Sequence, residues 1–181
     1  MSRTMQPLMR TAAFAGFVLV AGLAADKGTG ILFPDFSKPS NGTYEKPAAE
    51  IGKKTTDEAP WSVTTVTSSI GGKPVAGKPV SITGEIIDIS CYLQVGKHGD
   101  KHKDCGKKCA NNGQPIGLLT EDGDVYTLID EEHDPRRDGF TEVRKELINH
   151  MADVVKVHGT ATEVAGQKAI YITGTAKPAK K

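Results

Sequence analysis

The sequence predicts an all-β domain with two helices, folded as a five-stranded barrel. Five stretches are rich in alternating apolar or β-branched residues, two have helical periodicity, and turn signals separate them. The strands are expected at residues 79–91, 115–120, 125–130, 153–163 and 168–174, and the helices at 101–111 and 141–151. A helix between the third and fourth of five strands is typical of an OB-like Greek-key barrel. A plain β-sandwich is the alternative, because the pattern does not give the order of the strands in the sheet.

Local features support individual elements. The apolar residues of 79–91 change parity between Ile86 and Ile87, close to Gly84, which predicts a bulge or sharp bend in a strongly curved strand. The Asp122-Gly123 pair predicts a tight turn in a hairpin. The helix at 141–151 has an amphipathic stripe, and its members are Val143, Leu147, Ile148 and Met151.

The helix at 101–111 is inserted after strand 1, with Asp100 as the expected N-cap and Gly113 as the C-terminal stop. Upstream of the barrel, the folded part is expected to begin near Trp61. Residues 61–68 are rich in Val and Thr and are expected to be extended.

The first residues of the chain predict export. Arg3 and Arg10 precede an apolar run of about 15 residues and then Asp26, which together are typical of a secretory signal peptide at residues 1–25. The run is shorter than the ~20 residues that span a bilayer, so an uncleaved membrane anchor is the weaker alternative. We therefore expect a periplasmic protein of a Gram-negative bacterium, tethered to the membrane only if the segment remains uncleaved.

The remaining chain divides by composition. Residues 26–60 are rich in Lys, Pro, Gly, Ser and Thr and are expected to be a flexible linker or tether. The OB-like domain is expected over 61–175, and a solvated tail over 176–181. The whole chain has 23 Lys and Arg against 22 Asp and Glu. Such a balance argues against nucleic acid as a partner, because counterion release requires a basic surface.

All three cysteines and two of the five histidines lie within residues 91–109. On a helix at ~100° per residue, His102, Cys105 and Cys109 fall within roughly 60° of one another. Together with Cys91 they form a Cys3His set, which suits tetrahedral zinc, and the thiolates also suit copper(I). His98 is a spare candidate ligand. The lysines at 101, 103, 107 and 108 are expected to favour the thiolate forms.

The cysteines allow other interpretations. A disulfide from Cys91 to Cys105 or Cys109 would hold the inserted helix to the end of the first strand and leave one free thiol. Thiol-redox chemistry is a further alternative, although the chain has no Cys-x-x-Cys pair. The expected function is an exported metal-binding or accessory protein that binds one metal ion, zinc or copper(I), and is not an enzyme. The rival functions are a tethered interaction subunit of a membrane or periplasmic complex, with a structural disulfide, and a thiol-redox protein.

Three motifs carry a family resemblance. Residues 84–92 are Gly-Glu-Ile-Ile-Asp-Ile-Ser-Cys-Tyr, residues 99–109 contain Gly-x-x-His-x-x-Cys-x-x-x-Cys, and residues 113–119 are Gly-Gln-Pro-Ile-Gly-Leu-Leu. In these motifs the span 84–173 resembles small exported bacterial OB-like proteins, which are mostly uncharacterised. The resemblance implies the barrel and export, and it implies no particular reaction.

Overall fold

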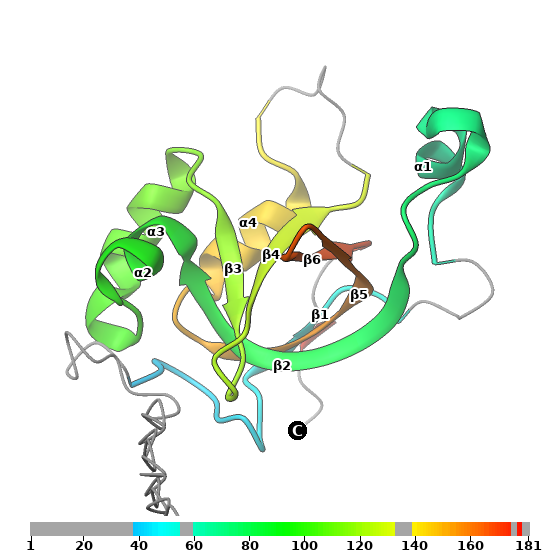
Figure 1. Ribbon diagram of the computed structural model, residues 1–181. Coiled ribbons are helices and arrows are strands. Elements are labelled where there is room, and N and C mark those ends of the chain that lie inside the picture. The colour runs from blue at the N-terminus through cyan, green and yellow to red at the C-terminus, as the bar shows by residue number, and fades with distance from the viewer. Residues whose placement is uncertain (1–37, 55–59, 133–138, 175–176, 179–181) are drawn as a thin grey trace, which may run out of the picture.

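The protein is described by a computed structural model in which residues 38–54, 60–132, 139–174 and 177–178 are placed (Figure 1). The expected signal peptide at residues 1–25 lies outside the described residues. Among the described residues, no helix has both the length and the apolar character that crossing a membrane requires.

Five strands form a closed barrel. They are β2 (Lys78–Asp88), β3 (Ile116–Leu119), β4 (Val125–Asp130), β5 (Val154–Val164) and β6 (Gln167–Ile172). Around the barrel the order is β2-β3-β4-β6-β5, and pairing of β5 with β2 closes it. β4 and β6 are parallel, and the other barrel neighbours are antiparallel. Helix α4 (Glu142–Asn149) connects β4 to β5. The OB-like Greek-key barrel is therefore confirmed.

Strand β2 curves around the barrel as a long ribbon (Figure 1). Residues 78–85 pair with β5, and residues 85–88 pair with β3. A Cβ atom at Gly84 would lie 2.7 Å from both the Leu118 Cγ and the Leu119 carbonyl oxygen, so a larger residue would prevent the close approach of β2 and β3. The expected bend at this glycine is thus where β2 changes partners.

The inserted segment between β2 and β3 contains more helix than expected. It comprises α2 (Ile89–Val95), a 3-10 turn η3 (Asp100–His102) and α3 (Lys103–Asn111). The predicted helix is confirmed as α3, but its N-cap is His102 and not Asp100, which begins η3. The first strand ends at Asp88 and not at Cys91. The reason is the Asp88 side chain, which accepts a hydrogen bond from Ser90 N at 3.0 Å and caps α2. Cys91 therefore lies on a helix.

The segment that we expected to be extended at 61–68 is instead helix α1 (Val63–Ser68), followed by the 3-10 turn η2 (Ile70–Gly72). Ser62 Oγ accepts from Thr65 N at 3.3 Å and caps the helix. Strand propensity depends on a neighbouring strand and a packed face. No residue of α1 is buried, so its β-branched residues lack that support.

The N-terminal segment differs from the expected linker. Residues 49–51 form β1 (Ala49–Ile51), which pairs in parallel with β5, and Ile51 is fully buried. In the expected tail, β7 (Lys177–Pro178) pairs with β1. β1 is too short to produce a detectable alternation in the sequence, so only its place beside β5 makes it a strand.

The barrel core is apolar and continuous with the inner face of α4. It includes Ile86, Leu118, Val157 and Ile170, each at 0 % exposure. The expected stripe is confirmed, since Val143, Leu147 and Ile148 of α4 are buried, as is Met151 in the turn that follows the helix. Helices α2 and α3 lie at one end of the curved β2, and α1 lies at its other end (Figure 1). The cysteine segment is therefore held at one end of a rigid barrel.

Candidate metal centre

The three cysteines converge at the end of β2. Cys91 lies on α2, and Cys105 and Cys109 lie one helical turn apart on the same face of α3. All three are free thiols, and their Sγ atoms lie within 4.8 Å of one another. Cysteines from two helices thus form a cluster of three thiols that lie close enough together to hold a metal ion.

A second group shares Cys91. One ligand atom each from Asp88, Cys91 and His102 also lie within 4.8 Å of one another. The His102 Nε2 and the Asp88 Oδ2 are 3.9 Å apart. Both atoms are buried, and neither has a hydrogen-bond partner among the described residues. Asp88 was not predicted as a ligand, although its position three residues before Cys91 was the available signal.

The four expected ligands thus fall into two overlapping groups. His102 lies with Cys91 and Asp88, outside the group that the three thiols form. Its position explains this, because His102 ends the 3-10 turn that precedes α3. The His102 side chain is only 5 % exposed, whereas Cys105 is exposed.

His98, the spare candidate ligand, belongs to neither group. Its Nδ1 lies 2.8 Å from the Glu85 Oε2, and both side chains are buried. The other Glu85 oxygen accepts from Gly99 N at 2.7 Å. The Tyr92 ring packs edge-on against the imidazole, with the ring centroids 5.8 Å apart. These contacts fix His98 in the loop that leads to η3.

The lysines near the site were expected to favour the thiolate forms, but the pKa values of two of the cysteines are raised. Burial, followed by the effect of the adjacent Asp88 carboxylate, raises the pKa of Cys91 to about 12. The same causes raise the pKa of Cys109. Burial lowers the pKa of His102, which favours a neutral imidazole. The pKa values of Cys91 and Cys109 are therefore raised and not lowered as the lysines predicted, and the Lys103 ammonium is bound to Asp153 at 2.8 Å.

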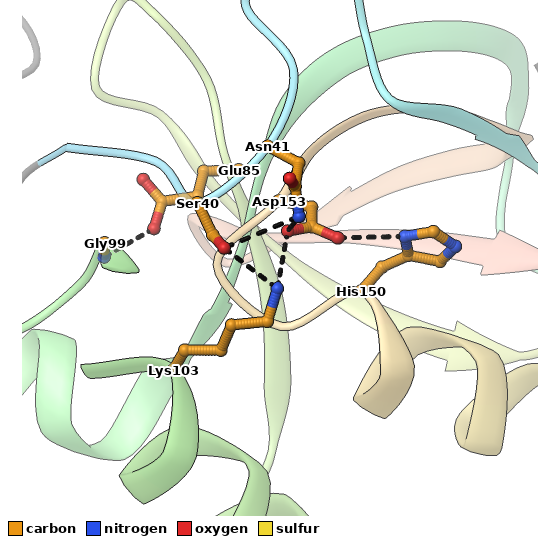
Figure 2. A network of polar contacts seen from close by, with 7 residues as sticks. All are labelled: Ser40, Asn41, Glu85, Gly99, Lys103, His150 and Asp153. Atoms are coloured by element: carbon orange, nitrogen blue, oxygen red, sulfur yellow. Dashed lines mark hydrogen bonds and ion pairs between the residues drawn. The ribbon is translucent and has the colours of Figure 1, made fainter. Parts of the chain in front are cut away.

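Asp153 anchors the inserted segment to the barrel (Figure 2). Its Oδ1 accepts from the Lys103 Nζ and the Asn41 Nδ2, both at 2.8 Å, and its Oδ2 lies 3.2 Å from the His150 Nδ1. Lys103 also donates to Ser40 Oγ at 3.0 Å. The start of α3, the segment before β1 and the end of α4 therefore meet at one carboxylate.

The other end of α3 is held by Arg144 of α4. Its guanidinium donates to the Ala110 carbonyl at 2.7 Å and to the Gln114 carbonyl at 2.8 Å. Carbonyls at a helix C-terminus otherwise lack partners, and a cation there also favours the helix dipole. With both ends of α3 fixed, Cys105 and Cys109 are held in place relative to Cys91.

Comparison of the chain with protein-family models, with curated proteins and with solved structures found no match. The site is therefore interpreted from its own donor atoms, which are three thiols, one imidazole and one carboxylate. Thiolate sulfur favours zinc and copper(I), and imidazole suits zinc. The donors fit a soft or borderline metal ion.

Proposed function

We propose that this protein binds a metal ion through Cys91, Cys105 and Cys109 and acts as an exported metal-binding or accessory protein, without enzymatic activity. The observation that carries the proposal is the approach of the three Sγ atoms to within 4.8 Å of one another. Free cysteines are usually buried singly, as small hydrophobic residues. Three of them that converge from two helices form a ligand set.

The ion is zinc or copper(I). Both bind thiolates, and three sulfurs satisfy copper(I), which prefers soft ligands. Structural zinc takes four donors. The sequence predicts His102 as the fourth, although the structure groups this histidine with Cys91 and Asp88 and not with all three thiols. The expected leader at residues 1–25 would place the protein in the periplasm, where a membrane or periplasmic complex is the expected partner. No nucleic acid partner is expected.

Protonation of Cys91 and Cys109 argues against the redox alternative. The reactive form of cysteine is the thiolate, and the raised pKa values of Cys91 and Cys109 keep both thiols protonated at neutral pH. A bound metal ion displaces the thiol proton, so the same burial does not prevent metal binding. Cys91 and Cys109, which stay protonated without a metal ion, are therefore better suited to holding an ion than to attacking a disulfide.

The test is elemental analysis combined with thiol titration, on full-length protein purified from its native compartment. We expect at least one equivalent of zinc or copper, with all three thiols protected from a thiol reagent until a chelator is added. A double Cys105→Ser, Cys109→Ser variant should lose the ion that the three thiols hold. The control is Lys108→Ser, which changes an exposed residue next to Cys109. A metal-free protein with one reactive thiol would overturn the proposal and support a structural disulfide.

A further inference from the structure

Two buried polar atoms face each other beside the thiols. The Asp88 Oδ2 and the His102 Nε2 have no hydrogen-bond partner among the described residues, and their side chains are 0 % and 5 % exposed. Removing such groups from water without a partner is unfavourable. The other Asp88 oxygen accepts from Ser90 N, so the capping role of this residue leaves Oδ2 unused.

The distance between the two atoms is slightly longer than the distance between donors that share a metal ion. Zinc binds nitrogen and oxygen at about 2.0–2.2 Å and sulfur at about 2.3 Å, so neighbouring donors on a tetrahedral ion lie roughly 3.3–3.8 Å apart. The His102 Nε2 and the Asp88 Oδ2 are 3.9 Å apart. The Cys91 thiol joins them, with all three donor atoms within 4.8 Å. An imidazole, a carboxylate and a thiol thus form a compact donor set without Cys105 or Cys109.

Cys91 belongs to this set and also to the three-thiol group. A thiolate sulfur has lone pairs for two metal ions. We propose that the site is a two-ion centre in which Cys91 bridges an outer ion, held by Cys105 and Cys109, and an inner ion, held by Asp88 and His102. This inference rests on the proposed function, because it assumes that the thiols bind metal.

The two positions differ in the ions that they accept. The outer position has only sulfur donors from the protein and takes zinc or copper(I). The inner position has one carboxylate and one imidazole, which suit zinc and disfavour copper(I). The centre should therefore hold two zinc ions but only one copper(I) ion.

Titration of reduced, metal-free, full-length protein with zinc chloride and, separately, with an acetonitrile complex of copper(I) tests this difference. We expect two equivalents of zinc and one of copper(I). The variants Asp88→Asn and His102→Gln should each lower the zinc stoichiometry to one and leave the copper(I) stoichiometry at one. The controls are Asp104→Asn, an exposed carboxylate of α3, and His150→Gln, and both should keep two zinc ions.

Cobalt(II) provides a test on the wild-type protein that does not depend on the folding of any variant. The paramagnetic resonance signal should grow up to one equivalent and fall with the second, because ions that share a thiolate couple magnetically. A signal that grows linearly up to two equivalents would contradict the bridge. One equivalent of zinc on the wild-type protein would overturn the inner position and leave the proposed function intact, whereas no binding of either metal would overturn both.

Discussion

Asp88 lies where strand β2, helix α2 and the candidate metal centre meet. It ends β2, its Oδ1 caps α2, and its Oδ2 lies 3.9 Å from His102. The cap turns the chain into a helix that places Cys91 close to the same carboxylate. One oxygen of this side chain therefore caps a helix, and the other faces His102 in the proposed metal site.

The two roles of Asp88 are separable by substitution. Asn is as good an N-cap as Asp, so Asp88→Asn should change the free energy of unfolding of the metal-free protein by less than ~0.5 kcal/mol, whereas Asp88→Ala should cost ~1 kcal/mol. Urea denaturation measures both values. Equal destabilisation by the two variants would show that Asp88 does not act as a cap.

A second residue-scale prediction concerns pH. Hydrogen bonding to Asp153 raises the pKa of His150 above its usual value. Its contribution to stability is therefore full below pH ~6.5, the unfolded pKa, and is lost as the pH rises through the folded pKa. Burial would raise the pKa of Asp153, but hydrogen bonds from His150, Lys103 and Asn41 lower it. The Asp153 contribution is thus present above the unfolded pKa and is lost only in acid, as the pH falls through the folded pKa.

The measurement is the free energy of unfolding of the metal-free protein between pH 5 and 9. The wild-type protein should lose stability above the unfolded pKa of histidine, and His150→Gln should remove that part of the slope. A Lys156→Gln control, on β5 and away from Asp153, should keep it. An unchanged slope in His150→Gln would contradict the assignment.

At the scale of elements, α3 is held at both ends by residues from other parts of the chain. Asp153 binds Lys103 at its start, and Arg144 binds the carbonyls of Ala110 and Gln114 at its end. Gly106 in the middle brings the helix close to the barrel, because a Cβ atom there would lie 3.0 Å from the Met151 Cγ. The position of the thiols thus depends on helix–barrel contacts.

Loss of the Arg144 contact should loosen this helix. Hydrogen bonds from a charged donor contribute about 1.5–3 kcal/mol, so Arg144→Ala should destabilise the protein by about 2 kcal/mol and should also weaken metal binding. The control is Lys145→Ala, which removes an exposed pair with Glu142 and should cost less than ~0.5 kcal/mol. Equal effects of the two variants in urea denaturation would contradict the role of Arg144.

Elements with their own periodicity were predictable from the sequence. The α4 stripe, the hairpin around Gly123 and the helix that carries Cys105 show local patterns of spacing and turn residues. The prediction that residues 61–68 are extended was wrong, because their β-branched residues have no strand beside them. Helix α2 was missed because Ile87 and Ile89 continue the alternation of β2, and only the Asp88 cap ends the strand.

At the scale of the whole molecule, the barrel extends to residues with little sequence signal. Residues 38–54 lie against the barrel, with Ala48 N donating to the Val154 carbonyl and β1 pairing with β5. Contacts between such distant segments leave no local pattern. The segment therefore belongs to the folded unit and positions Ser40 and Asn41 beside the inserted helices.

Ile51 tests how much this segment contributes. Its side chain is fully buried in the core cluster, so Ile51→Ala should cost ~2–5 kcal/mol in the free energy of unfolding. Ile70 is 95 % exposed, and Ile70→Ala should change stability by less than ~0.5 kcal/mol. A small loss for Ile51→Ala would mean that the segment docks weakly, as a linker would.

The sequence predicted which types of residue form the candidate site, but it predicted only in part which of them lie together. The spacing of Cys105 and Cys109 predicts a shared face on one helix, and the structure places Cys91 beside them. From the sequence, Asp88 is a candidate partner that holds His102 and not a metal ligand; the structure places the two side chains together, with His102 Nε2 3.9 Å from Asp88 Oδ2. Asp88 becomes visible as a donor through its unpaired buried oxygen.

X-ray absorption at the zinc edge, on full-length protein loaded with one equivalent of zinc, tests the thiol centre most directly. A centre formed by Cys91, Cys105 and Cys109 predicts a shell of three sulfur atoms at about 2.3 Å. The double Cys105→Ser, Cys109→Ser variant should lose that shell. A shell of nitrogen and oxygen atoms alone, or no bound zinc or copper(I), would contradict the proposed function.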